Sequence, residues 1–452
     1  MPDTLLRHPF MSQVALTQCN AHALVEAMLA FELALAEVQE ARGAMPEGTS
    51  KAMRDALAQH AFDLKQLAEG VASGGNAAIP FVKQGRAALP DAIKRYWHMG
   101  ATSQDVIDSA LMLLLKPRLA ALDALLQRCR IAAITLMQRH AATVMVGRTL
   151  MQQALPITFG VKVAHWAIGL EQARRRLLQV ALPVQFGGAV GIHSGWDELG
   201  LDFMDALAKR LDLDSPVLPW HTDRLPIHAL GTALDATMGA AEKLALDIAL
   251  LTQTEVAEVS EPAAPGMGES SSMPHKRNPV RCAMIRGAAR QVHGLVSVLL
   301  NATAQPLERG LGEWHAEWTP LLDSTLLLEG ALEQAAVLLE GLEVYPEAMR
   351  RNLEATSGGI MAEPVSRLLA PVLGQDAAKR VSAEAAETAR LKGITYAETL
   401  ETHAEVHTQL EGKLETEALR QATNPALYLG SSKAQVQRAI AWLQRGDDSI
   451  NS

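Results

Sequence analysis

The sequence predicts an all-α protein in which a long central bundle of five helices is flanked by two small helical domains. Hydrophobic residues make up 48% of the 452 residues, whereas Phe, Trp and Tyr together make up only 4%. Ala and Leu recur throughout instead, which favours helices and close contacts between helices over a large β-sheet. Apolar residues also recur at helical spacing in five long segments, and breaker-rich loops separate these segments.

The first predicted domain, residues 1–103, contains short amphipathic helices. The clearest of them is AHALVEAMLAFELALAEVQ, residues 21–39, and shorter helical segments follow until about Leu89. Residues 73–85 contain a Gly pair and a Pro, so we expect a loop there. A second segment rich in helix breakers, residues 98–104, precedes the first long helix.

The second predicted domain, residues 104–343, consists of the five long helices. In the first of them, apolar residues spaced by threes and fours form one stripe over about six turns. The stripe consists of Leu111, Leu115, Leu119, Leu122, Leu126, Cys129 and Ala133. The other four helices are predicted near residues 156–180, 226–259, 279–300 and 318–342. We expect Pro156 to start the second helix and Pro117 to kink the first slightly.

The third predicted domain, residues 344–452, returns to short helices separated by Gly and Pro.

Several of the long helices are apolar beyond a single stripe, as in LMLLLKPRLAALDALL. A stripe that is wider than one core requires predicts burial against other subunits, so we expect an oligomer.

Charge and cysteine content exclude several classes of protein. The chain has 41 Lys plus Arg against 50 Asp plus Glu, a net charge of -9, so general charge does not hold it to nucleic acid. Three scattered cysteines suit neither a disulfide framework nor a zinc site, and we expect no metal, no cofactor and a cytoplasmic location. Neither a signal peptide nor the ~18 uninterrupted apolar residues of a membrane span is found.

The segment richest in chemical groups is the loop EPAAPGMGESSSMPHKRNP, residues 261–279. It leads into a helix that is predicted to begin at Pro279, and the backbone N–H groups there, together with Lys276, are predicted to hold an anion. A long loop of this kind is usually functional or disordered, and the alternative is a plain linker. The phosphate-binding pattern G-x-x-x-x-G-K-[ST] is absent, which argues against hydrolysis of nucleotide triphosphates.

The segment before the first long helix is a second candidate for ligand contact. Here His98 precedes Thr102, Ser103 and Asp105. These residues could simply cap the helix, but capping does not require so many polar groups. We therefore expect them to contact a polar ligand.

Two further segments combine Arg with other polar groups. Arg148 and Gln153 lie just before Pro156, and Arg148 is suited to bidentate binding of a carboxylate. The alternative is a solvated or structural charge. Residues 307–318 contain Arg309, a His and two Trp, and the alternative there is a structural loop in which Trp anchors the next helix.

These segments resemble the fumarase/aspartase superfamily. SSSMPHKRNP, residues 270–279, resembles its signature loop Ser-Ser-x-Met-Pro-x-Lys-x-Asn-Pro. Residues 98–105 resemble its His-x-Gly-x-Thr-Ser-x-Asp element, and residues 147–149 resemble its Gly-Arg-Thr element. GNAAIP, GRTLMQQALPIT, QFGGAVG, PWHT and LGEWHAEW are similar to the branch whose members lactonise carboxylated muconates. The resemblance covers the whole chain.

The resemblance implies a homotetramer whose central helices form a shared bundle, with each active site built from three subunits. It implies that Ser270 handles the proton at the carbon next to a carboxylate, while Lys276 and Asn278 stabilise the enolate-like anion. The substrate is then a small tricarboxylate from protocatechuate (aromatic) degradation, in which one carboxylate adds to a double bond and closes a lactone. The predicted substrate-binding positions are His98, Thr102, Ser103, Arg148, Gln153, Ser271, Met273 and Arg309.

The residues after Gly-Arg-Thr favour a cycloisomerase over a lyase that releases an amine or water. Lyases of the superfamily that release an amine or water typically carry a His after Gly-Arg-Thr, because their leaving groups need a proton from a general acid. Here the corresponding positions are Leu150 and Gln153, and Asn76 stands where some of these lyases carry a further His. A carboxylate has a pKa of about 4 and departs unprotonated, so lactone chemistry needs no acid on that side.

Two departures from the family pattern keep other activities open. Glu269 stands where Gly usually precedes the first Ser, and Leu150 replaces an aromatic residue. The alternatives within the superfamily are a cycloisomerase for another substituted muconate, such as 3-sulfomuconate, and a lyase of the adenylosuccinate or argininosuccinate type. The alternative outside it is a helical scaffold, which would need neither the Ser-rich loop nor the Arg148 cluster.

Overall fold

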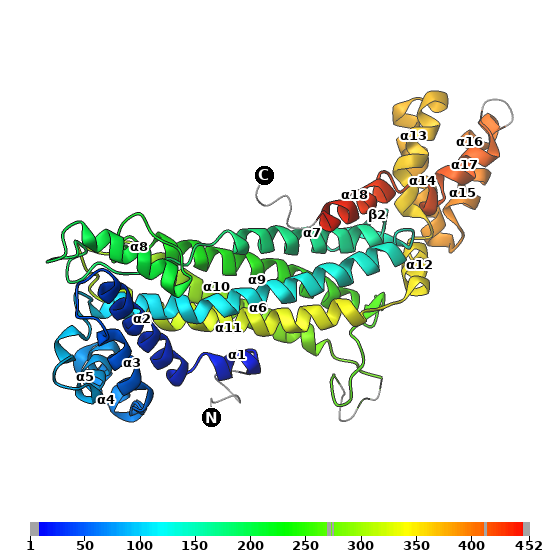
Figure 1. The fold of residues 1–452 in the computed structure, drawn as a ribbon. Coiled ribbons are helices and arrows are strands. Elements are labelled where there is room, and N and C mark those ends of the chain that lie inside the picture. Colours follow the sequence, from blue (N-terminus) through cyan, green and yellow to red (C-terminus); the bar gives the residue numbers. More distant parts are fainter. Residues whose placement is uncertain (1–8, 269–272, 274, 411–413, 446–452) are drawn as a thin grey trace. The chain divides into compact units, whose positions relative to one another are not determined.

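The computed structural model describes residues 9–268, 273, 275–410 and 414–445 of the chain. Its regular structure is almost entirely helical (Figure 1), which confirms the predicted all-α class. The described N-terminal region contains short helices. They are α1 (Gln13–Gln18), α2 (Ala21–Ala41), α3 (Thr49–Ala58), α4 (Leu64–Gly74), α5 (Ala78–Ala88) and the 3-10 turn η1 (Lys94–Tyr96). The helix predicted over residues 21–39 is confirmed as α2.

The loop predicted over residues 73–85 is wrong. Only residues 75–77 separate α4 from α5. Pro80 is the third residue of α5, where Pro is tolerated because the N–H that it lacks has no partner in the first turn of a helix. The side-chain oxygen of Asn76 accepts a hydrogen bond from the backbone N–H of Ala78 at 3.1 Å and so caps the helix.

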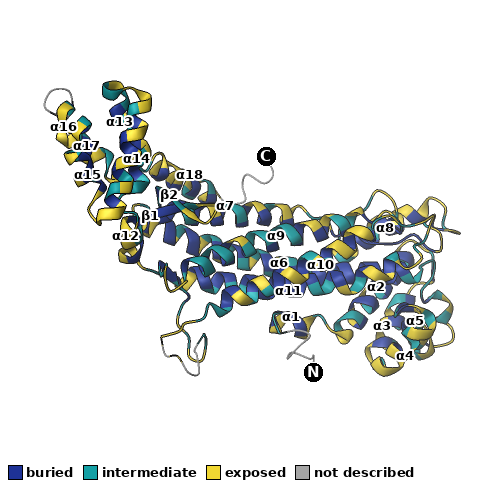
Figure 2. Ribbon diagram, turned by 180° about the vertical axis from the view of Figure 1, so that it is seen from behind, coloured by how far each residue is buried: buried dark blue, intermediate teal, exposed yellow. Residues whose placement is uncertain are grey.

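The five predicted long helices are confirmed, and they run alongside one another (Figure 1). They are α6 (Ser103–Arg139), α7 (Phe159–Leu178), α9 (Leu225–Leu251), α10 (Val280–Asn301) and α11 (Glu313–Gly341), with the shorter α8 (Leu199–Leu211) between α7 and α9 in the chain. Each of these helices carries buried residues along its length (Figure 2). All residues of the stripe predicted in α6 are buried except Leu119, which is half-buried, and α6 continues through Pro117.

Residues 144–158 form a β-hairpin that the sequence analysis missed. β1 (Val144–Thr149) pairs antiparallel with β2 (Gln152–Thr158). The turn residues Leu150 and Met151 both have positive φ, 48° and 66°. Positive φ at both positions is the backbone that a two-residue hairpin turn requires, although Gly and Asn are the usual residues there. The unusual turn residues explain why the sequence pattern did not indicate a hairpin.

Two predicted helix starts are displaced. Pro156 lies in β2, opposite Val146, and α7 begins at Phe159. A two-stranded hairpin consists only of edge strands, so Pro is tolerated in it. Pro279 immediately precedes α10, and its carbonyl oxygen accepts the first helical hydrogen bond from Ala283 at 3.0 Å. A second small sheet pairs β3 (Val259–Ser260) with β4 (Glu343–Val344).

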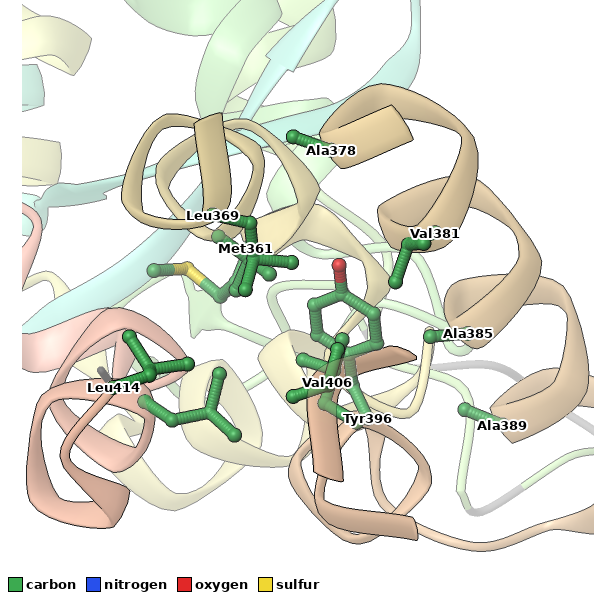
Figure 3. Close-up of a cluster of buried hydrophobic side chains, with 12 residues drawn as sticks. Met361, Leu369, Ala378, Val381, Ala385, Ala389, Tyr396, Val406 and Leu414 are labelled. Atoms are coloured by element: carbon green, nitrogen blue, oxygen red, sulfur yellow. The ribbon is translucent and has the colours of Figure 1, made fainter. Parts of the chain in front are cut away.

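The C-terminal region consists of short helices, and residues between 361 and 419 form a core of their own (Figure 3). The short helices are α12 (Pro346–Glu354), η2 (Gly359–Met361), α13 (Ala362–Leu373), α14 (Gln375–Lys392), α15 (Tyr396–Thr402), α16 (Ala404–Leu410), α17 (Thr416–Ala422), η3 (Pro425–Leu427) and α18 (Ser432–Gln444). Tyr396 lies among Leu369, Val381 and Val406 in this core. Its hydroxyl bonds Ser382 Oγ at 2.6 Å, and burial raises the pKa of Tyr396 to about 12.

The chain divides into two compact units, each assembled from three segments. Unit 1 comprises residues 1–126, 173–242 and 284–333, and unit 2 comprises residues 127–172, 243–283 and 334–452. Every long helix contributes to both units, so the three predicted domains stay a prediction. Within the described residues, no helix combines the length and the hydropathy that crossing a bilayer demands.

Candidate active site

The predicted site residues fall into two groups, one in each unit. Unit 1 holds His98, Thr102, Ser103 and Arg309, and unit 2 holds Arg148, Gln153, Met273, Lys276 and Asn278. Ser270 and Ser271 lie outside the described residues. Each group contains a cationic or titratable side chain that is held by a buried carboxylate.

In unit 1, Asp105 fixes the start of α6. Its fully buried carboxylate accepts hydrogen bonds from the backbone N–H of Thr102 at 2.9 Å and of Gly187 and Gly188 at 3.1 and 3.0 Å. His221 Nε2 lies 2.7 Å from the same carboxylate. Asp105 therefore does the capping that sequence reasoning also allowed for Thr102, and it ties the helix start to the QFGGAVG segment.

The hydroxyls of Thr102 and Ser103 make no hydrogen bond with another group of the described chain. Both residues are half-buried at the start of α6. Because Asp105 already caps the helix, these two hydroxyls stay available for a ligand. That arrangement is what the prediction of a polar ligand at this segment requires.

His98 is held by a buried glutamate. Its Nδ1 lies 2.5 Å from Glu32 Oε1, and Glu32 is 1% exposed. Burial alone opposes a charged imidazole, but the negative charges of Glu32 and Asp105 outweigh it and raise the pKa of His98. His98 has a φ of 60°, and at Gly100 nearby an added Cβ would lie 2.2 Å from Trp196. The sequence analysis missed Glu32, which is 66 positions away.

Arg309 is engaged with the protein. Its Nη1 donates to Gln104 Oε1 at 2.9 Å, and its Nη2 donates to the carbonyl oxygens of Gly188 and Ala189 at 3.3 and 2.6 Å. Gln104 in turn donates to the carbonyl oxygen of His221 at 2.8 Å. Burial lowers the pKa of Arg309. The guanidinium therefore joins the loop before α11 to the start of α6.

In unit 2, Arg148 is already paired with a carboxylate. Its two Nη atoms lie 2.9 and 2.8 Å from the two oxygens of the fully buried Glu258. Asn352 Nδ2 also donates to Glu258, at 2.8 Å, and Gln153 Nε2 donates to the carbonyl oxygen of Asn352 at 3.1 Å. Gln153 Oε1 is buried and has no hydrogen-bond partner in the described structure. The bidentate partner of Arg148 is thus a glutamate 110 positions away, which no local signal reveals.

The described part of the signature loop lines a cavity of about 1000 Å³. Lys276 and Asn278 face it together with Thr252, Ser260 and Tyr345. Lys276 is exposed, and Asn278 is half-buried. Met273 is 41% exposed. The cavity brings the two predicted anion-stabilising side chains of the loop into one space.

The anion at the start of α10 is part of the protein. The carboxylate of Glu261 accepts hydrogen bonds from the backbone N–H of Arg281 at 3.0 Å and of Cys282 at 2.8 Å. These are the N–H groups that we expected to hold a ligand anion. That expectation is wrong in detail, because these N–H groups are occupied, and the positive charge of Lys276 and the amide of Asn278 are left to bind a ligand anion.

A sequence profile described as a lyase matches residues 8–294. The chain belongs to the fumarase/aspartase family of lyases. The chain is 42% identical over 423 residues to a 3-carboxy-cis,cis-muconate cycloisomerase of Pseudomonas aeruginosa, covering 92% of this chain and 91% of the relative. It is 38% identical over 431 residues to a nitrosuccinate lyase of Streptomyces davaonensis, covering 92% and 90%.

A solved structure supports the same placement in the family. The 3-carboxy-cis,cis-muconate lactonizing enzyme of Pseudomonas putida superposes with a TM-score of 0.91 at 36% identity, covering 100% of both chains. The predicted family and fold are therefore confirmed. Among the described residues of this family member, no group of three or more His, Cys, Asp or Glu could hold a metal ion.

Proposed function

We propose that the protein is a cycloisomerase that interconverts 3-carboxy-cis,cis-muconate and a carboxymuconolactone. The observation that carries this proposal is the similarity, over nearly the whole chain, to a curated enzyme of that name. The turn of the hairpin supports it as well. An amine-releasing lyase carries a general acid at this position, but here the residue is Leu150, which cannot donate a proton and is 97% exposed.

In the proposed reaction, one carboxylate of the substrate adds to a double bond of the same molecule. A C–O bond forms, the π electron pair moves toward the adjacent carbon, and negative charge develops on the carboxylate attached to that carbon. Lys276 and Asn278 stabilise this charge. Ser270 then supplies the proton to the carbon, which completes the lactone without oxidation or reduction.

The remaining predicted residues hold the tricarboxylate in this scheme. Thr102 and Ser103 offer hydroxyl donors, and the positive charge favoured on His98 attracts an anion. Arg148 and Arg309 add positive charge near the ligand, although both guanidinium groups also bind protein oxygens. The other predicted contacts are Gln153, Ser271 and Met273.

The proposal includes a cytoplasmic homotetramer with active sites shared between subunits, acting in protocatechuate degradation. The wide apolar faces of the long helices support burial between subunits.

A lyase acting on nitrosuccinate is the second candidate. The 38% identity to a lyase of that name favours it, and so does the leaving group. Nitrite is the anion of an acid about as strong as a carboxylic acid, so it also departs without a proton. The missing acid at Leu150 therefore excludes neither candidate.

An ultraviolet assay of the purified protein separates the candidates. Turnover of 3-carboxymuconate removes its conjugated diene and lowers the ultraviolet absorbance. We expect this loss with 3-carboxymuconate, and the same assay with 3-sulfomuconate tests the substituent. Release of fumarate from nitrosuccinate, adenylosuccinate or argininosuccinate, without turnover of the muconate, would contradict the proposal in favour of a lyase.

The role of Ser270 has its own test. Ser270→Ala should lower kcat by about 10²–10⁴-fold, the usual contribution of a positioned proton donor, and leave the helical circular dichroism spectrum unchanged. The neighbouring Ser272→Ala is the matched control and should keep most of the activity. Near-normal turnover of Ser270→Ala would remove the residue from the mechanism.

A further inference from the structure

Arg277, the residue between Lys276 and Asn278, is tied to a strand that the proposed mechanism does not use. Its Nη1 and Nη2 each donate to one carboxylate oxygen of Glu343, both at 3.3 Å. Its Nη2 also donates to the carbonyl oxygen of Glu261 at 3.2 Å. The end of the signature loop is therefore anchored to β4 by an ion pair, and to the segment after β3 by a hydrogen bond.

Glu343 is itself held in place. The hydroxyls of Tyr345 and Ser260 donate to Glu343 Oε2 at 2.5 and 3.0 Å, and the pairing of β3 with β4 sets Ser260 opposite Glu343. Hydrogen bonds from Arg277 and Tyr345 outweigh partial burial and lower the pKa of Glu343 to about 2. The carboxylate is therefore charged at neutral pH.

The backbone on both sides of Arg277 is also constrained. The N–H of Lys276 donates to the carbonyl oxygen of Met273 at 3.0 Å, and the N–H of Asn278 donates to that of Gly268 at 2.9 Å. Gly268 has a φ of 73°, and a Cβ there would lie 2.6 Å from the carbonyl oxygen of Asn278. The backbone of Asn278 is thus held against Gly268, and the side chain of Arg277 ties the same segment to β4.

We propose that Arg277 and Glu343 form a positioning pair that sets Lys276 and Asn278 in the cavity. The inference rests on the proposed function for the roles of Lys276 and Asn278, and it deepens that function. Arg277 lines the same cavity as Lys276 and Asn278. Glu343 is connected to this cavity through Ser260 and Tyr345, which line it and donate hydrogen bonds to its carboxylate. Anchoring the middle residue of three limits rotation of the backbone on both sides, which keeps the flanking side chains in place.

The test is a double-mutant cycle on turnover of 3-carboxymuconate. Glu343→Gln and Arg277→Gln should each lower kcat about tenfold to a hundredfold, the cost of misplacing a stabilising group by about 1 Å. KM should change much less, because Lys276 and Asn278 act on charge that develops in the transition state. The double variant should be no slower than the slower single variant, because both changes remove the same interaction.

Glu340→Gln is the matched control. Glu340 lies three positions before Glu343 and pairs with Arg128 through two contacts of 2.9 Å. The side chains of this pair are 42% and 47% exposed, close to the 37% and 52% of Glu343 and Arg277. Because Arg128 lies on α6 and not on the loop, we expect this variant to keep the kcat of the wild type.

Hydrogen exchange separates failure of this inference from failure of the proposed function, because it needs no substrate. The amides of residues 275–278 and 280–282 should exchange faster in Glu343→Gln than in the wild type or in Glu340→Gln. Wild-type kcat in both single variants, losses that multiply in the double variant, or unchanged exchange would each overturn the positioning pair. If the wild type does not turn over 3-carboxymuconate, the proposed function fails and the exchange result alone decides the inference.

Discussion

His98 and Arg148, two residues predicted to bind the substrate, each face a buried glutamate. Glu32 lies 2.5 Å from His98, and Glu258 binds both Nη atoms of Arg148. A buried carboxylate favours the charged form of its neighbour and restricts its orientation. Both side chains are therefore oriented before any substrate arrives.

The charge of His98 depends on Glu32. In Glu32→Gln burial, the largest influence, still lowers the pKa of His98 and Asp105 alone is left to raise it, so this pKa should fall below its wild-type value. NMR titration of the His98 ring measures this pKa. Glu26→Gln on the exposed side of the same helix should leave the titration of His98 unchanged. A titration of His98 that is the same in Glu32→Gln and the wild type would contradict the assignment.

The same pair makes stability depend on pH. The raised pKa of His98 in the folded state means that its contribution is fully present below the unfolded pKa of about 6.5. The contribution is lost as pH rises through the higher folded pKa. The fall in unfolding free energy over this window should therefore be smaller in Glu32→Gln, as measured by urea denaturation at several pH values.

Lys276 is exposed on the cavity and is the charged group proposed to face the developing anion. Lys276→Met should lower kcat by about 10²–10³-fold, as removal of one preorganised stabilising group does elsewhere. Steady-state turnover of 3-carboxymuconate measures the loss. Lys392→Met, on the exposed last turn of α14, is the matched control and should retain full activity. A loss confined to KM would move Lys276 from catalysis to ground-state binding.

At the scale of elements, a buried ionic network joins the ends of the long helices in unit 1. Arg224 precedes α9 and is 1% exposed. It donates to Asp108 on α6 at 2.8 Å and to Glu317 on α11 at 2.6 Å, and both carboxylates are 1% exposed. Trp314 also donates to Asp108, at 2.8 Å. Charged groups buried to this extent depend on one another, because each would otherwise be unpaired in a poor solvent.

Removing the cation of this network should be costly. Arg224→Met leaves two buried carboxylates without their cation, and we expect a loss of about 3–5 kcal/mol in the free energy of unfolding. Urea denaturation measures this change. Arg210→Met breaks the exposed pair with Glu37 and should cost no more than about 1 kcal/mol. Equal losses in the two variants would show that burial does not set the cost.

At the scale of the whole molecule, the predicted site is divided between two units. Thr102, Ser103 and Arg309 belong to unit 1, and Lys276 and Asn278 belong to unit 2. We propose that each complete site of the tetramer combines groups from different chains. Light scattering should therefore give the mass of four chains of 48.6 kDa each.

Sharing of sites predicts complementation between inactive variants. We expect Lys276→Met and Thr102→Val/Ser103→Ala each to be nearly inactive alone. When the two proteins are unfolded and refolded together, some sites receive only wild-type groups, and activity should return. The same variants refolded separately and then mixed provide the control. Activity that does not return on joint refolding would contradict shared sites.

The helices could be predicted because their causes are local. An apolar stripe at three- and four-residue spacing specifies a buried helix face, and α6 and α2 appear where that spacing predicts them. The hairpin at 144–158 could not be predicted, because Leu150 and Met151 occupy a turn that usually requires Gly or Asn. The loop expected over 73–85 was wrong for a related reason, since Pro80 suits a first helical turn as well as a loop.

The sequence by itself determined the all-α class, the five long helices and the motif that carries Lys276 and Asn278. Each of these depends on residues close together in the chain, through periodicity or a short motif. Only the tertiary structure decided the partners of the charged groups: Glu258 for Arg148, Glu32 for His98 and Glu343 for Arg277. Electrostatic pairing depends on distance in space and on burial, and packing of segments far apart in the chain sets both.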